Sequence, residues 1–380
     1  MIFKNISAKF SLVYFSIFMV IGINAPFFPL WLSSKGFTER YIAIILAASV
    51  LTKLFSNPFF AGLGDKYGDR KIPMLYLAFF STIILFSLNI LNSIYLIAFM
   101  SILSWALFAP LMPLTESITT TAIKKHNFDY GNTRLWGSVS FIIVAFFGGI
   151  IIEKYGLEYV PVLMTIGALF LFISIIYMPT INSLPARKKI STYSLLKNRN
   201  FFPFLLACGA IQSSHGLYYS FSTIYWKSIG ISETIIGALW AEGVIFEIFL
   251  LAYFYKFKNY TSPKNFLILA GIIAIIRWSL MVFADSVLFI ASIQILHAFT
   301  FGLTHLAAIS FISDIMPVRA QAKSQALYSA ISMGAFLAIS IAASGDLYKL
   351  FYNKSFLFSS FLAFIGVLIA IKFIKVRKTF

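Results

Sequence analysis

Residues 31–39 read WLSSKGFTE, and residues 225–233, which lie 194 positions later, read YWKSIGISE. This alignment places Gly36 opposite Gly230 and Glu39 opposite Glu233. A second pair of similar stretches, residues 92–103 (NSIYLIAFMSIL) and 285–296 (DSVLFIASIQIL), is separated by 193 positions. Two offsets that agree to within one residue predict a chain built from two similar halves.

The composition indicates a protein dissolved in lipid. Of the 380 residues, 60% are hydrophobic and only 11% are charged, and the mean hydropathy is +0.88. A soluble domain carries about 25% charged residues, and a disordered chain is poor in apolar ones, so both classes are excluded. A helix needs about 20 apolar residues to cross a bilayer. The chain therefore has room for twelve short-looped spans and no large soluble domain.

Apolar runs separated by short polar breaks predict an all-α membrane protein with 12 transmembrane helices in two pseudo-symmetric six-helix bundles. Residues 1–178 form the first bundle, 179–200 a cytoplasmic linker with Pro185, and 201–380 the second bundle. The predicted spans are 9–32, 40–64, 72–91, 93–122, 133–153, 158–178, 201–226, 234–256, 264–284, 286–314, 320–346 and 354–375. Because both halves start on the same side, they are parallel repeats about an axis along the membrane normal.

The distribution of the basic residues along the chain indicates membrane topology rather than nucleic-acid binding. The net charge is +17, yet 22 of the 30 basic residues lie in alternate loops and termini, 6 lie in the other loops, and two (Lys53 and Arg277) lie within spans. This is the positive-inside pattern. It predicts cytoplasmic termini, a bacterial inner-membrane location and no nucleic-acid partner. The first apolar stretch is longer than a signal-peptide core, so we expect it to remain as a span. Cys208 is the single cysteine, which excludes an intrachain disulfide.

The loop after the second span reads AGLGDKYGDRK over residues 61–71, and it resembles the Gly-x-x-x-Asp-Arg/Lys-x-Gly-Arg-Lys/Arg loop of the major facilitator superfamily. Four residues match well: Asp65, Lys66, Gly68 and Arg70. A glycine turn would let Asp65 lie against a helix N-terminus or an arginine of the other bundle and hold the cytoplasmic side closed. The alternative is an ordinary polar loop.

Ionisable residues inside spans are costly unless they face a partner or water, so they mark candidate sites. In the second half, Glu247 and Arg277 lie near the middle of spans 8 and 9 and are expected to pair. This pair is either a proton site or a static salt bridge. Glu242 lies five residues from Glu247, about 140° around a helix, so the two carboxylates do not share one partner.

Two histidines of span 10, His297 and His305, are eight residues apart and are expected to lie on broadly one side of the helix. Imidazole carries a proton near neutral pH or hydrogen-bonds a substrate, so both join Glu247, Arg277 and Glu242 as candidate proton-coupling residues. A structural role is the alternative. No metal site is expected.

The candidate substrate-binding residues come from both halves. Prolines follow Asn24 and precede Glu116, which suits bent helices that line a cavity. Glu116 and Arg134 are expected to pair across spans 4 and 5, and Lys53 either binds an organic anion or makes a structural contact. The remaining candidates of this set, in span 7, are His215 and Tyr219.

Several stretches resemble the 3-phenylpropionate transporter family of the major facilitators, which is related to the lactose and nucleoside permeases. These stretches are Asp129–Ser138 (DYGNTRLWGS), His215, Tyr218–Phe221, Ile224–Trp226, Glu247, Arg277–Trp278, Gln294–His297 and His305–Ala308. The resemblance implies proton-coupled uptake by alternating access, with spans 1, 4, 7 and 10 around a central cavity, and suggests an aromatic monocarboxylate as substrate.

The sequence thus predicts a secondary transporter of a small organic solute that is energised by the proton gradient, uses no cofactor and acts as a monomer. A nucleoside or sugar:proton symporter is the main alternative, because the histidines, Asn24 and several tyrosines also suit hydroxyl groups. An efflux carrier and a membrane scaffold or sensor are further alternatives. An enzyme is not expected, because no nucleophile–base spacing or metal signature is present.

Overall fold

The computed structural model describes residues 5–181 and 191–375, and this described part is helical with no strand. The first-half helices are α1 (Ile6–Ser34), α2 (Glu39–Tyr67), α3 (Lys71–Ser87), α4 (Ile94–Phe108), α5 (Leu111–His126), α6 (Tyr130–Tyr155) and α7 (Tyr159–Tyr177). The others are α8 (Thr192–Leu196), α9 (Phe201–Ser213), α10 (Gly216–Ser228), α11 (Glu233–Phe257), α12 (Pro263–Met281), α13 (Val287–Gln294), η2 (Ala298–Leu303), α14 (Thr304–Ile315), α15 (Val318–Ala330), η3 (Ile331–Ala335), α16 (Phe336–Phe351), η4 (Tyr352–Ser355) and α17 (Phe356–Phe373).

The all-helical membrane fold expected from the composition is confirmed. Each predicted span falls on a helical segment, and within the described residues nine stretches are long and apolar enough to cross a membrane. One of these stretches, Val318–Phe373, covers two predicted spans. The count of twelve crossings therefore stays a prediction.

Many large apolar side chains are exposed on the surface of the protein. Phe55 is 77% exposed, Phe283 69% and Ile339 68%. Apolar surface on this scale is unfavourable in water. Backbone polar groups that face lipid must be satisfied within the segment, which a helix achieves through its own hydrogen bonds. Outward apolar residues on self-satisfied helices are the arrangement that a bilayer requires.

The repeated turns take the same backbone conformation in both halves. Gly36 has φ +86° and Gly230 has φ +88°, in the left-handed region that glycine adopts without steric cost. Helix α2 then starts at Glu39 and α11 at Glu233, each with an acidic residue in its first turn. The internal alignment at an offset of 194 is therefore matched by equal local structure.

The chain forms two compact units that exchange short segments. Unit 1 comprises Met1–Thr38, Ala48–Arg187 and Gly230–Ala241, and unit 2 comprises Glu39–Ala47, Lys188–Ile229 and Glu242–Phe380. The predicted domain limits at 178 and 201 stay a prediction, and residues 182–190 of the predicted linker lie outside the described residues.

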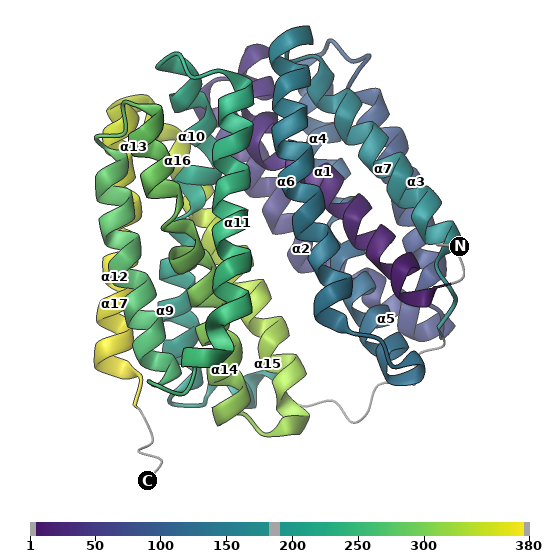
Figure 1. The fold of residues 1–380 in the computed structure, drawn as a ribbon, viewed down its shortest axis with the longest axis vertical. Helices are drawn as coiled ribbons and strands as arrows, with labels where there is room; N and C mark the ends of the chain where they lie inside the picture. The colour runs from purple at the N-terminus through teal and green to yellow at the C-terminus, as the bar shows by residue number, and fades with distance from the viewer. Residues whose placement is uncertain (1–4, 182–190, 376–380) are drawn as a thin grey trace. The chain divides into compact units, whose positions relative to one another are not determined.

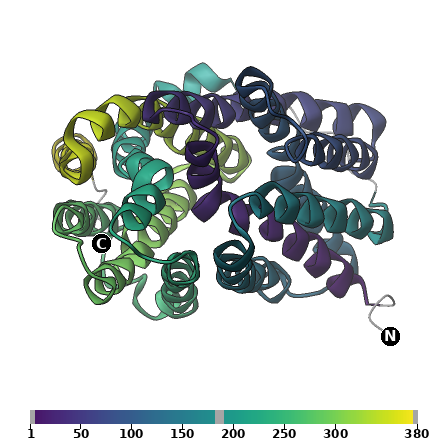
Figure 2. The same cartoon turned by 90° about the horizontal axis from the view of Figure 1, so that it is seen from above.

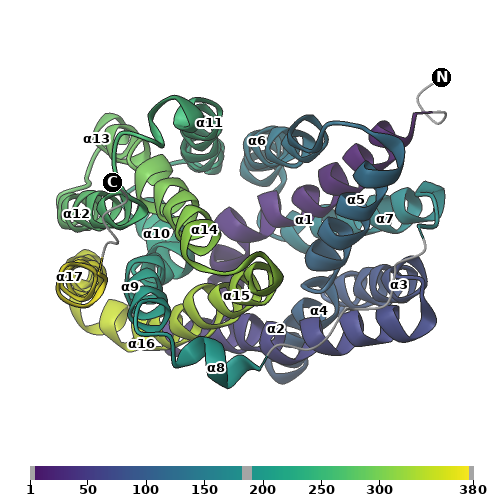
Figure 3. The same ribbon diagram turned by 90° about the horizontal axis from the view of Figure 1, so that it is seen from below.

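Each unit is a bundle of packed helices (Figure 1). In unit 1, α1 packs against α6 and α7, and α3 packs against α7; the purple α1 can be followed in Figure 2. In unit 2, α17 packs against α9 and α12, as Figure 3 shows from below. The core of unit 2 includes Phe204 and Phe311, whose rings are stacked with centroids 3.9 Å apart.

Four of the predicted spans are not single regular α-helices. Span 4 is divided into α4 and α5 at Pro110, and span 7 into α9 and α10 at Ser214 and His215. Spans 10 and 11 contain the π-helical segments η2 and η3. Irregular backbone at membrane depth is tolerated where protein groups satisfy it, and π-segments are frequent at functional sites. Two of these interruptions lie at polar side chains of unit 2, because His215 is at the break in span 7 and Thr300 is within η2.

Candidate functional site

In unit 1, Glu116 and Arg134 lie together, as the sequence predicted. Arg134 Nε is 3.4 Å from Glu116 Oε1, and the two side chains are 28% and 29% exposed. The Tyr130 hydroxyl donates a hydrogen bond of 2.7 Å to Glu116 Oε2. Tyr130 is near the start of α6 and Glu116 is on α5, so two helices fix this carboxylate.

The guanidinium of Arg134 lies against aromatic rings of α1. Its Cζ is 4.5 Å from the ring centroid of Phe18 and 5.5 Å from that of Tyr14. These distances are typical of cation–π contacts. In the described part of the chain, Nη1 and Nη2 have no hydrogen-bond acceptor, so the outer edge of the guanidinium is open to a ligand. Planar anions such as carboxylates bind this edge through two parallel hydrogen bonds.

Two buried hydroxyls add to the polar character of this cluster. Tyr14 Oη and Thr119 Oγ1 are buried, and the two side chains interact with each other. Tyr14 interacts electrostatically with Glu116. Sequence reasoning missed Tyr14, Phe18 and Thr119, because an aromatic or hydroxyl residue in an apolar span gives no signal of its own. Tyr130 lies within the stretch that carries the family resemblance and could have been selected from it.

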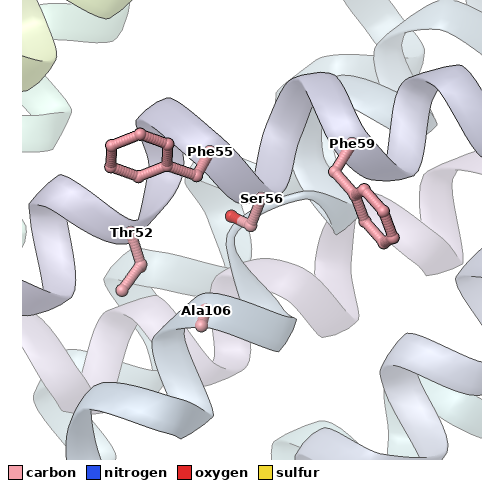
Figure 4. Close-up of a pocket in the computed structure, with 5 residues that line it drawn as sticks. All are labelled: Thr52, Phe55, Ser56, Phe59 and Ala106. Atoms are coloured by element: carbon pink, nitrogen blue, oxygen red, sulfur yellow. The ribbon is translucent and has the colours of Figure 1, made fainter.

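The other unit 1 candidates are not part of this cluster. Lys53 Nζ lies 5.7 Å from the ring centroid of Trp105, and Asn24 on α1 has a buried side-chain oxygen with no partner among the described residues. A pocket of about 410 Å³ is lined by Thr52, Phe55, Ser56, Phe59 and Ala106 (Figure 4). Because Phe55 and Phe59 are largely exposed, this pocket is an apolar groove on the outer surface and includes none of the predicted binding residues.

The loop after α2 forms a contact different from the two that we expected. Asp65 Oδ1 is 2.6 Å from Arg70 Nη2, an arginine of the same loop, and Gly68 ends α2 in the left-handed conformation at φ +66°. Arg70 also donates to the Ser117 hydroxyl on α5. Asp65 is thus paired with Arg70 within unit 1, and the expected contact with a helix N-terminus or an arginine of the other bundle stays a prediction. The gating role of Asp65, Lys66, Gly68 and Arg70 stays a prediction.

In unit 2, Arg277 of α12 is fully buried and is bound by neutral groups. Nη1 donates to Thr300 Oγ1 at 2.9 Å and to His297 Nδ1 at 3.1 Å, and Nη2 donates to Gln294 Oε1 at 2.9 Å. The Trp278 ring centroid is 4.4 Å from the guanidinium carbon.

The predicted ion pair between Glu247 and Arg277 is wrong for this structure. No ion pair joins Arg277 to a carboxylate within residues 5–181 and 191–375, because its Nη donors are already taken by α13 and η2. Glu247 instead interacts electrostatically with Tyr219, and Glu242 with Tyr218. The prediction that the two carboxylates do not share one partner stays a prediction.

The hydrogen bonds fix which nitrogen of each histidine carries a proton. An arginine only donates, so His297 Nδ1 accepts and, in the neutral ring, Nε2 carries the proton. His215 Nδ1 is 3.2 Å from the Gln212 carbonyl oxygen, which only accepts, so this nitrogen donates. His215 Nε2 lies 3.1 Å from Thr300 Oγ1. The polar chain therefore runs from Arg277 through Thr300 to His215.

The two histidines of predicted span 10 bind different groups in the contacts that the structure describes. His297 binds Arg277, whereas His305 Nδ1 lies 3.4 Å from the Tyr328 hydroxyl. The π-helical segment η2 lies between them and changes the rotation per residue, so their placement on one side of the helix stays a prediction. Thr300 lies within η2, and no feature of the sequence pointed to it.

Within the described residues, no group of three or more His, Cys, Asp or Glu could hold a metal ion. Two polar clusters that contain predicted site residues lie in the described part of the chain, one in each unit. The cluster of unit 1 offers an open cation, and that of unit 2 a buried hydrogen-bond network.

Comparison with known proteins places these clusters in a transporter. Residues 7–359 match the MFS_1 like family. The chain is 29% identical over 362 residues to the "Probable 3-phenylpropionic acid transporter" of Escherichia coli (strain K12), covering 89% of this chain and 90% of that protein. It is 23% identical to the sucrose permease of Escherichia coli over 78% of this chain and 76% of that one.

The structure resembles the crystal structure of the nucleoside transporter NupG with a TM-score of 0.82 and 14% sequence identity, covering 98% of this chain and 100% of that one. At this identity the likeness shows the fold alone. These relatives are transporters rather than enzymes, in agreement with the prediction from the sequence. They also indicate a multi-pass protein of the inner membrane.

Proposed function

Because the chain belongs to the MFS_1 like family, which places it among the major facilitator transporters, we propose that it is a proton-coupled symporter that takes up an aromatic monocarboxylate by alternating access. The relative named as a probable 3-phenylpropionic acid transporter supports this class of substrate. We further propose that both termini are cytoplasmic, that the proton gradient is the energy source without a cofactor, and that the protein acts as a monomer.

The observation that carries the proposal is the open guanidinium of Arg134 beside Phe18. A carboxylate bound to Nη1 and Nη2 would form two charge-assisted hydrogen bonds, which are stronger and more directional than neutral ones. The aryl ring of the same molecule would pack against the aromatic side chains of α1, which favour offset or edge contacts. A planar acid with an attached ring uses both features at once, whereas a sugar uses neither fully.

Proton coupling is proposed to involve the unit 2 candidates, which are Glu247, Arg277, His297, His305 and Glu242. A proton placed on His297 Nδ1 would break the hydrogen bond from Arg277 Nη1, so the protonation state of His297 and the orientation of Arg277 are linked. A change of this kind in a buried network biases one conformation of the bundle over another.

The test of this function is uptake into proteoliposomes with an imposed pH gradient. We expect 3-phenylpropionate to accumulate and to be displaced at least about tenfold more weakly by its neutral amide, which lacks the charge that the arginine recognises. Glu247→Gln should lose gradient-driven accumulation and keep substrate exchange without a gradient. Glu158→Gln, which changes an exposed carboxylate paired with Lys35, is the matched control. Equal displacement by the amide, or full accumulation by Glu247→Gln, would contradict the proposal.

A nucleoside or sugar:proton symporter is the second candidate. The buried polar atoms of Asn24, Tyr14 and Thr119 suit hydroxyl-bearing solutes, and relatives include a sucrose permease. Accumulation of uridine or sucrose in place of the aryl acid would favour this candidate, and net export from loaded vesicles would favour an efflux carrier. Candidate binding residues in either case include Lys53, His215 and Tyr219, of which His215 is fully buried in this structure.

A further inference from the structure

The carboxylate of Glu116 forms only one long contact with the arginine beside it. Its contact with Arg134 is a single approach of 3.4 Å to Nε, which is long for a charge-assisted hydrogen bond. Its shorter contact, at 2.7 Å, comes from the neutral hydroxyl of Tyr130. Glu116 therefore leaves most of the charge on Arg134 available to another anion.

A bound substrate would place a second carboxylate on the same guanidinium. Two carboxylates that share one cation carry one negative charge too many, and the repulsion between them favours the uptake of a proton by the pair. The substrate would use both Nη atoms of Arg134, whereas Glu116 uses only Nε. The better-held carboxylate stays ionised, so the proton goes to Glu116.

The surroundings of Glu116 can accept its protonated form. The Tyr14 hydroxyl of α1 is buried and interacts with both Glu116 and Thr119, so its oxygen can accept the new O–H. From α6, the facing ionisable groups are Tyr130 and Arg134. Near the start of α3, Arg70 binds the neighbouring Ser117 and is itself paired with Asp65. The ionisable side chain of α4 is Tyr95, which is 85% exposed.

We propose that Glu116 binds one proton together with each substrate carboxylate, so that substrate binding in unit 1 is itself proton-linked. This inference rests on the proposed function, because it requires an anionic substrate on Arg134. It does not depend on Glu247 or on the buried network of Arg277. It makes Glu116 a proton-binding residue as well as a neighbour of the substrate.

The test is equilibrium binding of 3-phenylpropionate to the detergent-purified protein between pH 6 and 8. If one proton binds with each substrate, the affinity of the unchanged protein falls about tenfold per pH unit as pH rises. In weakly buffered solution, a pH-indicator dye should report one proton taken up per substrate bound. Glu116→Gln should bind with an affinity that does not depend on pH and should take up no proton.

Two further variants make the result decisive. Glu116→Asp keeps the carboxylate and should restore the pH dependence, which a merely structural role of Glu116 would not require. Glu158→Gln removes a carboxylate outside this cluster and should behave as the unchanged protein. Binding without proton uptake in the unchanged protein, or an unaltered pH slope in Glu116→Gln, overturns this inference while the proposed function stands. If no aryl carboxylate binds at any pH, the proposed function falls and this inference with it.

Discussion

Arg134 of unit 1 and Arg277 of unit 2 are the same side chain in opposite environments. Arg134 is 28% exposed, touches one carboxylate through Nε and leaves both Nη atoms open. Arg277 is fully buried, and its Nη atoms bind Gln294, Thr300 and His297. A guanidinium with open Nη donors can bind an anion, whereas a buried one whose Nη donors are occupied orients the side chains around it. Under the proposed function, this difference predicts that the cluster of unit 1 binds the substrate carboxylate and that the cluster of unit 2 is an internal hydrogen-bond network.

The same contrast separates what is repeated in the chain from what is not. The turns at Gly36 and Gly230 have nearly equal φ values, so the frame of the two halves is shared. At the offset of 193 residues, however, the position equivalent to Arg134 is Leu327, and that equivalent to Arg277 is Ile84. The repeat therefore supplies the scaffold, and the buried charges differ between the halves.

The largest expected effect comes from replacing each arginine by lysine, which keeps the charge and removes the planar guanidinium. At Arg134 we expect the affinity for 3-phenylpropionate to fall about 100-fold, or about 2.7 kcal/mol, because one ammonium cannot form the two parallel hydrogen bonds. Thermal stability should be unchanged, since the side chain is partly exposed. Binding is measured by titration calorimetry and stability by thermal unfolding in detergent.

Arg277→Lys should show the reverse pattern. A lysine at this position cannot reach all three acceptors, so buried polar atoms of Gln294, Thr300 and His297 lose partners, and stability falls by roughly 2 kcal/mol. The affinity for substrate should stay within about threefold of the unchanged protein, well inside 1 kcal/mol. Arg40→Lys, at an exposed ion pair with Asp346, is the control for the substitution itself. A loss of binding at Arg277 with no loss at Arg134 would reverse the assignment of the two units.

A smaller effect is expected from glycines that lie beside the two clusters. A Cβ added at Gly137 would lie 2.8 Å from Phe18 and 2.9 Å from Arg134 Nη1, so Gly137→Ala must displace the guanidinium. Because overpacking of this kind costs about 1 kcal/mol, we expect roughly fivefold weaker binding of the aryl acid. A Cβ at Gly243 of unit 2 would lie 3.3 Å from His297, a contact that a small shift relieves.

Gly243→Ala is therefore the matched variant for Gly137→Ala, and it should leave the dissociation constant within about twofold. Titration calorimetry on both proteins at one pH makes the comparison. Equal losses of affinity in the two variants would show that the substrate contacts both clusters. This result would contradict the prediction that the substrate binds only the cluster of unit 1.

The sequence predicted the helical fold, the repeated turns and the ion pair of the unit 1 cluster. Hydropathy gave the helical membrane fold, and the internal alignment located the turns at Gly36 and Gly230. The pairing of Glu116 with Arg134 was also predictable, because both residues lie near the ends of consecutive spans joined by a short loop, where few partners are within reach.

The hydrogen-bond network of unit 2 was not predictable from the sequence. Depth in the membrane suggested a pair between Glu247 and Arg277, but hydropathy fixes depth and says little about how each helix is rotated. The helix is interrupted at Ser214 and His215, where the sequence has no proline that would have predicted the interruption. It is stabilised by tertiary contacts, such as the hydrogen bond of 2.8 Å from Trp278 Nε1 to Ser214 Oγ. Such contacts override local helix propensity.

The smallest expected effect tests the shared frame itself, through two lysines that are equivalent at the offset of 193 residues. Lys71 Nζ donates to the carbonyl oxygens of Ile176 and Met178 at 2.8 and 2.6 Å, where α7 ends. Lys264 Nζ donates to those of Ile371 and Ile374 at 3.1 and 2.6 Å, where α17 ends. A cation at a helix C-terminus satisfies carbonyls that have no partner within the helix and complements the helix dipole.

Lys71→Met and Lys264→Met should therefore each lower stability by about 1 kcal/mol. The two losses should agree with each other, and substrate affinity should not change, because neither lysine belongs to the polar clusters. Thermal unfolding in detergent measures the stabilities, with Lys258→Met in an exposed loop as the control. A loss at one position and none at the other would mean that the halves share a chain path without sharing the interactions that hold it. The two halves would then share their backbone structure but not the interactions that stabilise it.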